Sequence, residues 1–188
     1  GSQHCQKHTP EFLQETINAC RVVTQEPLLF RLDSGNDSAD NIGIFLEGGC
    51  SFIIKRNLRR ESKEEWLEEV KDKCLDITSP REGKNVYVGS TWRDISYTGS
   101  DGEKHPFTVR SVYEITERSI DKHGQHLFPA DIEVNMWDVN VEFSDHDIIA
   151  LYHAHGESEQ FHSEVKTDMD LERFPSGKFD TNELVLEL

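Results

Sequence analysis

The chain has 188 residues, with 20 Lys and Arg against 36 Asp and Glu, and its formal net charge is −16. This excess of acid argues against tight binding of a phosphate backbone by this piece alone, because such binding depends on Lys and Arg that neutralise phosphates. It is compatible with an acidic metal site and equally with an acidic, solvated surface.

The length fits one domain or a domain that carries an insertion. No apolar run approaches a membrane span, so we expect no membrane association. The four cysteines are widely spaced without a C-x-x-C pair, which favours reduced thiols in a cytosolic protein over disulfides. His4, Cys5 and His8 suggest a metal-binding tail, but a solvated tail is the preferred interpretation because nothing supplies the remaining ligands.

The first third of the chain alternates helical and strand patterns. An amphipathic helix is predicted over 10–23, a buried strand over 27–32, a capped helix over 39–47 and a second strand over 51–55. Strand, helix and strand with short connections predict a crossover between two parallel strands. Asp33 would then stand at the carboxyl end of the first strand, the usual edge for active-site groups. The alternative is a turn, since Asp before Ser-Gly is common turn chemistry.

The middle of the chain changes from a helical to a strand-like sequence pattern. A helix is predicted over 62–75, and from 85 to 142 polar residues alternate with β-branched or aromatic ones between turn-rich segments. This pattern predicts an antiparallel meander of roughly four to six strands. Trp92 and Trp137 are expected in its core rather than as platforms for stacked bases.

The stretch after residue 143 predicts one more helix, with a capping start at Ser144. If this helix continues, Tyr152, His155, Glu159 and Lys166 share one side of it, at about 100° per residue. An aromatic, an imidazole, a carboxylate and an ammonium make a poor core face and a plausible site face.

Other acidic and histidine residues on the same predicted helix are weaker candidates for a site. Glu157 and Glu164 point to the far side of the same helix, so Glu159 is the candidate carboxylate. A zinc site from His153, His155 and His162 is a weaker alternative, because no cysteine or second ligand cluster accompanies these histidines.

Two blocks together resemble the insertion-sequence transposases of the DDE class. Tyr152, His155, Glu159 and Lys166 have the spacing of the Y-R-E-K signature of a bacterial group of these enzymes. FRLDSG around Asp33, followed by a helix and SFIIKRN, resembles the segment that carries their second Asp. GESEQFHSEVKTDMDLERFPSGKF resembles the long motif of one bacterial branch. The likeness covers most of the chain and is clearest in 27–57 and 143–188.

The resemblance implies a site and a chemistry. Asp33 would be the second and Glu159 the third acidic residue that hold two Mg²⁺ (or Mn²⁺) ions for DNA cleavage and strand transfer. Lys166 would contact a DNA phosphate near the cut, with Tyr152 and His155 beside it. Transposon ends and target DNA would be the partners, bound by a homodimer in a synaptic complex, and the location would be the bacterial cytoplasm at the nucleoid.

Two departures from the family pattern matter. The basic position of the signature is His155 instead of Arg, and a histidine gives no planar two-point grip on phosphate. The family's first Asp is expected upstream of residue 1, so this piece alone is expected to be inactive.

The resemblance also implies a fold. The expected class is α/β: part of an RNase-H-like mixed sheet with flanking helices, interrupted by an antiparallel β-rich insertion. Residues 3–57 would begin the catalytic core, 58–142 would form the insertion, and 143–188 would continue the core with the Glu-bearing helix. The alternative function is a non-catalytic interaction or regulatory domain, such as a domesticated or decayed transposase remnant.

Overall fold

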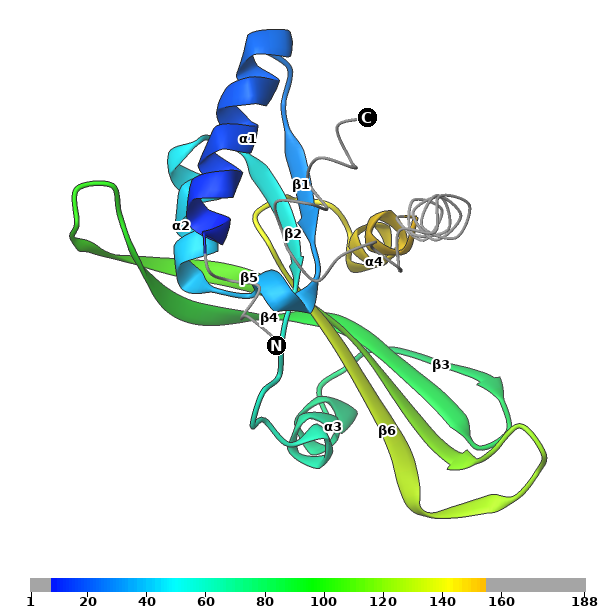
Figure 1. Ribbon diagram of the computed structural model, residues 1–188. Helices are drawn as coiled ribbons and strands as arrows, with labels where there is room; N and C mark the ends of the chain where they lie inside the picture. Colours follow the sequence, from blue (N-terminus) through cyan, green and yellow to red (C-terminus); the bar gives the residue numbers. More distant parts are fainter. Residues whose placement is uncertain (1–7, 155–188) are drawn as a thin grey trace, which may run out of the picture. The chain divides into compact units, whose positions relative to one another are not determined.

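The computed structural model describes residues 8–154, and residues 1–7 and 155–188 lie outside the described part. The chain divides into two compact units, Gly1–Ile149 and Ala150–Leu188. The first unit holds nearly all of the described residues and is described by itself. The described residues form a mixed α/β fold with four α-helices and one curled, six-stranded mixed sheet (Figure 1).

The elements follow one another in the order labelled in Figure 1. The helices are α1 (Thr9–Val23), α2 (Ala39–Glu47), α3 (Lys63–Lys71) and α4 (Asp145–His153), with a short 3-10 helix η1 (Ser34–Asn36). The strands are β1 (Leu29–Leu32), β2 (Ser51–Lys55), β3 (Asp76–Arg81), β4 (Lys84–Thr98), β5 (Lys104–Ile120) and β6 (His126–Val139).

The predicted crossover is present. β1 and β2 are parallel and paired along the whole of β1. Ser38 begins α2, since its side chain accepts the amide hydrogen of Asn41, and Gly48 ends the helix. Asp33 therefore stands directly after the carboxyl end of β1.

The six strands lie in the order β1-β2-β6-β5-β4-β3. The four strands from β3 to β6 are antiparallel neighbours. The antiparallel meander predicted over 85–142 is present, but it has three long strands, β4, β5 and β6, where four to six were expected. β2 and β6 also pair, with Ile53 opposite Val139, so the meander continues the sheet of the crossover. The side chain of Asn140 extends this pairing: its Oδ1 accepts the Phe52 amide hydrogen at 2.8 Å and its Nδ2 donates to the Cys50 carbonyl at 3.0 Å.

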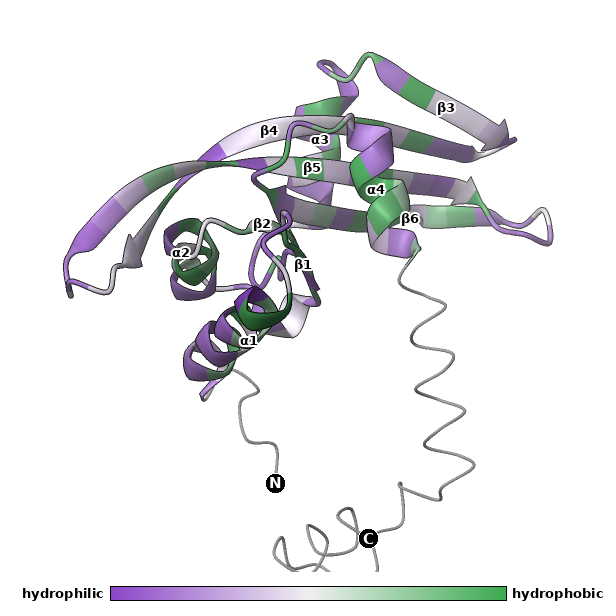
Figure 2. Cartoon of the chain, turned by 90° about the horizontal axis from the view of Figure 1, so that it is seen from above, coloured by the Kyte–Doolittle hydropathy of each residue, from purple (hydrophilic) through white to green (hydrophobic). Residues whose placement is uncertain are grey.

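One face of the sheet carries two hydrophobic clusters. Helices α1 and α2 each carry green and purple residues in Figure 2, as expected for helices that pack one side against a sheet. The first cluster joins α1 and α2 to the sheet through Leu13, Ile17, Ile42, Phe45, Phe52, Ile54 and Val109. The second joins α3 to it through Leu67, Val70, Cys74, Tyr87, Tyr113, Ile115 and Met136.

Helix α4 begins on the opposite face of the sheet. Ser144 caps it as predicted: the Ser144 Oγ accepts the Asp147 amide hydrogen at 3.1 Å. Arg110 of β5 forms an ion pair with Asp145, and His146 Nε2 lies 2.6 Å from Asp76 Oδ2. The buried side chain of Ile148 completes this attachment.

Two sequence predictions need correction. The helix predicted over 62–75 ends at Lys71, and the unpredicted strand β3 follows almost at once. β3 lies at the edge of the sheet with mostly exposed residues, and it contains Pro80, which an edge strand tolerates. Such a strand lacks the apolar pattern that identifies a buried one.

The second correction concerns the tryptophans. Trp137 is fully buried as predicted, but Trp92 is 68% exposed. Trp92 lies on the outward side of β4 in a run where every second residue faces solvent, from Ser90 to Thr98. Strand alternation places it on the face opposite α1, α2 and α3, and the large size of a tryptophan side chain does not by itself predict burial.

Candidate functional site

The predicted site residue Asp33 lies on an exposed turn between β1 and α2. Its Oδ1 accepts two hydrogen bonds, from the Gly35 amide at 3.0 Å and from Asn36 Nδ2 at 2.8 Å. This is the turn chemistry that the sequence offered as the alternative. Among the described residues, none donates a hydrogen bond to Oδ2, so the two bonds to Oδ1 orient the carboxylate of this exposed residue.

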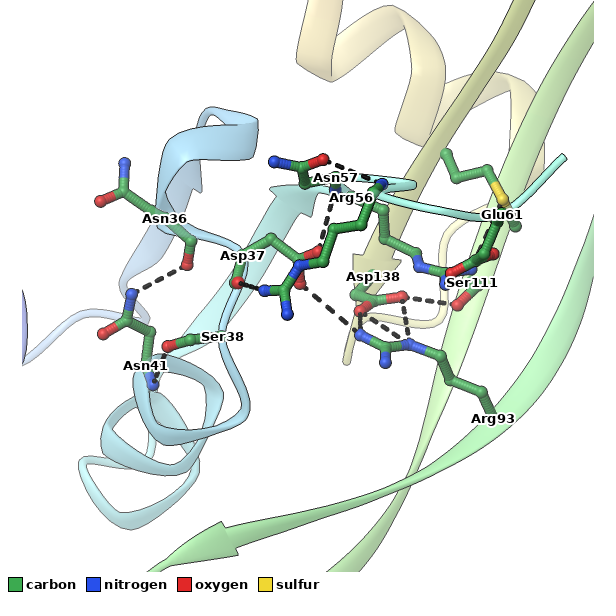
Figure 3. Close-up of polar contacts among 12 residues, drawn as sticks. Asn36, Asp37, Ser38, Asn41, Arg56, Asn57, Glu61, Arg93, Ser111 and Asp138 are labelled. Atoms are coloured by element: carbon green, nitrogen blue, oxygen red, sulfur yellow. Dashed lines mark hydrogen bonds and ion pairs between the residues drawn. The ribbon is translucent and has the colours of Figure 1, made fainter. Parts of the chain in front are cut away.

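The connection between β1 and α2, residues 33–38, is also held by hydrogen bonds between residues that are close in sequence. The buried side chain of Asn41 donates from Nδ2 to the Asn36 carbonyl at 2.8 Å. The Asn41 amide donates to Ser38 Oγ at 3.1 Å. The connection that carries Asp33 is therefore built around the first turn of α2 (Figure 3).

Sequence reasoning missed a buried charge network beside this connection. Asp37 and Asp138 flank the guanidinium of Arg93, and the side chain of Asp138 is fully buried (Figure 3). Arg93 grips Asp138 at two points, with Nε 3.1 Å from Oδ2 and Nη2 in close contact with the same oxygen. Ser111 Oγ donates to Asp138 Oδ1 at 2.5 Å. Asp37 Oδ1 lies 3.7 Å from Arg93 Nη2.

The network lies between the two hydrophobic clusters, on the same face of the sheet. Burial alone would lower the pKa of Arg93, but hydrogen bonding and charge from Asp138, with further charge from Asp37, raise it above its ordinary value. Arg93 therefore stays charged. The sequence contained a signal for this charge network. Side chains two residues apart on a strand lie on the same face, so Arg93 shares a face with Ile95 and Tyr97. A charged group on an apolar face implies a buried partner of opposite charge.

A cationic segment after β2 borders the same connection. The Asn57 amide donates to Asp37 Oδ2 at 2.9 Å, and Arg59 Nη2 donates to the Asp37 carbonyl at 3.0 Å. Arg59 has a left-handed backbone, with φ of 51°, which costs energy for a residue other than glycine. Arg56 pairs with Glu61 at 2.7 Å. Asn57 and Arg59 therefore bind Asp37 from the segment that follows β2.

The other predicted site residues divide between described and undescribed parts. Tyr152 is half-buried on α4, and its ring meets His153 edge-on with 6.1 Å between the centroids. His155, Glu159 and Lys166 lie outside the described residues, so their roles stay predictions. The alternative zinc ligand His162 and the far-side acids Glu157 and Glu164 lie there too, as do His4 and Cys5 of the tail.

A cavity of about 440 Å³ lies on the opposite face of the sheet from the Arg93 network. Its lining includes Trp92, Phe107, Arg110 and Asn140. Arg110 is already engaged, because it pairs with Asp145 and donates to the Phe143 carbonyl at 2.8 Å. Asn140 is engaged by the backbone of β2. Arg110 and Asn140 therefore serve the fold at this cavity.

Within residues 8–154, no group of three or more His, Cys, Asp or Glu side chains converges as a metal site would require, and no helix is long and apolar enough to cross a membrane. The chain matches no protein-family model, and no curated protein is significantly similar to it.

Proposed function

We propose that the chain is part of a DDE-class transposase and contributes two carboxylates, Asp33 and Glu159, to a site that cuts and joins DNA. The observation that carries the proposal is the position of Asp33, directly after β1 in a parallel β1-α2-β2 crossover. Carboxyl ends of parallel strands are where ligands and reacting groups meet in α/β sheets. The resemblance of 27–57 and 143–188 to these enzymes supplies the rest.

The Asp33 carboxylate has the chemistry of a ligand for a hard divalent cation. Its exposed position leaves Oδ2 open, while the bonds from Gly35 and Asn36 to Oδ1 limit its rotation. Mg²⁺ takes oxygen ligands and keeps several waters, so few protein carboxylates suffice. When bound, a pair of such ions would activate the attacking oxygen and stabilise the leaving oxygen of the phosphodiester.

The proposal gives the remaining residues the roles that the resemblance implies. Lys166 would neutralise a DNA phosphate, with Tyr152 and His155 beside it. His155 replaces the arginine of the family signature, and an imidazole lacks the planar two-point contact that a guanidinium makes with phosphate, so we expect His155 to contribute less to phosphate binding than Lys166. The finer fold assignment, an RNase-H-like core with residues 58–142 as an insertion, belongs to the same proposal.

A metal titration tests the carboxylates. Mn²⁺ added to the ¹⁵N-labelled chain is expected to broaden the amide signals of Gly35 and Asn36 first, because paramagnetic relaxation acts at short range. Asp33→Asn and Glu159→Gln should each remove that broadening. Asp121→Asn is the matched control, because Asp121 Oδ1 accepts two backbone amides, both at 2.8 Å, in another turn. Equal broadening around Asp121 and Asp33 would refute a specific site.

A DNA titration tests the phosphate contact. The slope of log affinity against log salt is about −0.9 for each phosphate neutralised on duplex DNA. Lys166→Ala should therefore reduce the magnitude of the slope by about 1, measured by fluorescence anisotropy. Lys122→Ala, on the exposed β5–β6 turn, is the control. Identical slopes for both variants would exclude the proposed role of Lys166.

One observation favours the second candidate function, a non-catalytic interaction or regulatory domain. The two hydrogen bonds to Asp33 Oδ1 are those of a carboxylate that serves a turn alone. Under this function, Asp33→Asn keeps the turn, because an amide oxygen accepts the same bonds, and no Mn²⁺ effect centres on residues 33–36. The metal titration separates the two functions.

A further inference from the structure

The connection between β1 and α2, which includes Asp33, is bound to the rest of the fold through Asp37, four residues after Asp33. Asp37 is largely buried and receives contacts from three directions. The Asn57 amide donates to its Oδ2 at 2.9 Å, Arg59 Nη2 donates to its carbonyl at 3.0 Å, and Arg93 Nη2 lies 3.7 Å from its Oδ1. The first two contacts come from the segment after β2, and only the third comes from the meander.

Arg93 is itself fixed by the meander. The fully buried Asp138 of β6 holds the guanidinium at two points, and Ser111 of β5 holds Asp138 at 2.5 Å. The Arg93 guanidinium binds Asp138 through Nε and Nη2, and Nη2 carries a second hydrogen that can face Asp37. A lysine ammonium in its place keeps the charge but loses the two-point grip. Arg93 thus links Asp37 to the three strands β4, β5 and β6.

We propose that Arg93 is a positioning residue for Asp33: by holding Asp37 at the far end of η1, it fixes where the Asp33 carboxylate stands. The role of Asp33 as a metal ligand rests on the proposed function, whereas the tether from Arg93 to the connection does not. The strand β4, within the segment predicted as an insertion, then takes part in building the site. Residues that orient metal ligands commonly change metal affinity about 10–100-fold when they are replaced.

Three variants test this role. Arg93→Met removes the charge and the grip but keeps much of the volume, and Arg93→Lys keeps the charge. Arg118→Met is the matched control, because Arg118 of β5 also joins two carboxylates, Asp131 at 2.9 Å and Glu133 at 2.6 Å. Its side chain is 26% exposed against 31% for Arg93. The contacts of Arg118 stay within β5 and β6.

The first measurement is amide hydrogen exchange in the metal-free chain. The Asn57 amide donates to Asp37 and the Gly35 amide donates to Asp33, so both report on the connection. Arg93→Met is expected to speed both exchanges about tenfold or more, Arg93→Lys less, and Arg118→Met not at all. Asp37→Asn should mimic Arg93→Met at Asn57, and it serves as the second variant if Arg93→Met fails to fold.

The second measurement is Mn²⁺ affinity, read from the broadening at Gly35. Arg93→Met should weaken it about tenfold, with partial recovery in Arg93→Lys, while Arg118→Met should leave it unchanged at equal folded fraction. A merely structural Arg93 would lower stability without this difference between the two methionine variants.

The outcomes separate this inference from the proposed function. If the unmodified chain shows no Mn²⁺ effect that depends on Asp33, the proposed function fails, and hydrogen exchange alone decides whether Arg93 holds the connection. If Mn²⁺ binds at Asp33 but folded Arg93→Met keeps both the affinity and the exchange rates, the inference is overturned and the proposed function stands.

Discussion

The Asn140 side chain joins the end of β6 to the start of β2, and its removal should be costly. Asn140→Ala takes the acceptor from the amide of Phe52, a fully buried residue, and the donor from the carbonyl of Cys50, which is 3% exposed. A buried backbone group left without a partner costs about 1–3 kcal/mol.

The magnitude follows from the exposure of the site. Two such losses would total about 2–6 kcal/mol, but Asn140 itself is exposed, so water can reach part of the vacated space. We therefore expect Asn140→Ala to lower the free energy of unfolding by about 2–4 kcal/mol. This is a large share of the roughly 5–15 kcal/mol that stabilises a typical domain.

Asn140→Asp separates the two bonds. The introduced carboxylate can still accept from Phe52, but at neutral pH it has no hydrogen to donate to the Cys50 carbonyl and repels it instead. Below about pH 4 the carboxyl group becomes protonated and regains a donor. The deficit of this variant relative to the unmodified chain should therefore shrink as the pH falls.

Urea unfolding followed by circular dichroism, at pH 7 and again near pH 4, measures both effects. Asn135→Ala, within β6, is the control, because Asn135 Nδ2 makes an exposed bond, 3.1 Å from Glu133 Oε1, and the change should stay within about 0.5 kcal/mol. The reasoning is wrong if Asn140→Ala also costs less than about 0.5 kcal/mol, or if acidification leaves the deficit of Asn140→Asp unchanged.

Three further predictions concern single contacts. A Cβ at Gly43 would lie 2.3 Å from the Tyr97 ring, so Gly43→Ala should destabilise the chain by about 1–3 kcal/mol in urea unfolding, and the cost should disappear in a Tyr97→Ala background. Burial, with nearby Cys74, raises the pKa of Tyr113 well above the value near 10 of an unfolded tyrosine. Its contribution to stability is full below about pH 10 and is lost as the pH rises further, so Tyr113→Phe should lose less stability between about pH 9 and pH 11; equal losses would contradict this. Ser38→Ala removes the α2 cap and should cost about 1 kcal/mol, seen as a lower urea midpoint.

The parts of the fold that sequence predicted are those with local causes. The crossover followed from two short apolar runs, and the helix between them followed from Ser38 at its start and Gly48 at its end. Asp33 needed only its place after the first run. Each of these signals lies within a few residues of the feature that it predicts.

The parts that sequence could not predict depend on distant partners. Arg93 and Asp138 are 45 positions apart, and local patterning does not say which carboxylate meets which guanidinium. The pairing of β2 with β6 depends on which strand of the meander comes to lie beside β2, and local sequence does not determine this. The edge strand β3 has too few buried residues to produce a recognisable strand pattern. Whether Asp33 serves a metal or only its turn also stayed open, because both uses need the same residue in the same place.

The pairing of β2 with β6 has a consequence for synthesis on the ribosome. Phe52 and Asn140 are 88 positions apart, so β2 has β1 on one side and an open edge on the other until β6 emerges. At about 5–20 residues per second, that edge waits roughly 4–18 s for its partner. Unpaired strand edges recruit other strands, so a nascent chain is most prone to aggregate in this interval. Translation speed between β2 and β6 should thus influence the yield of folded protein.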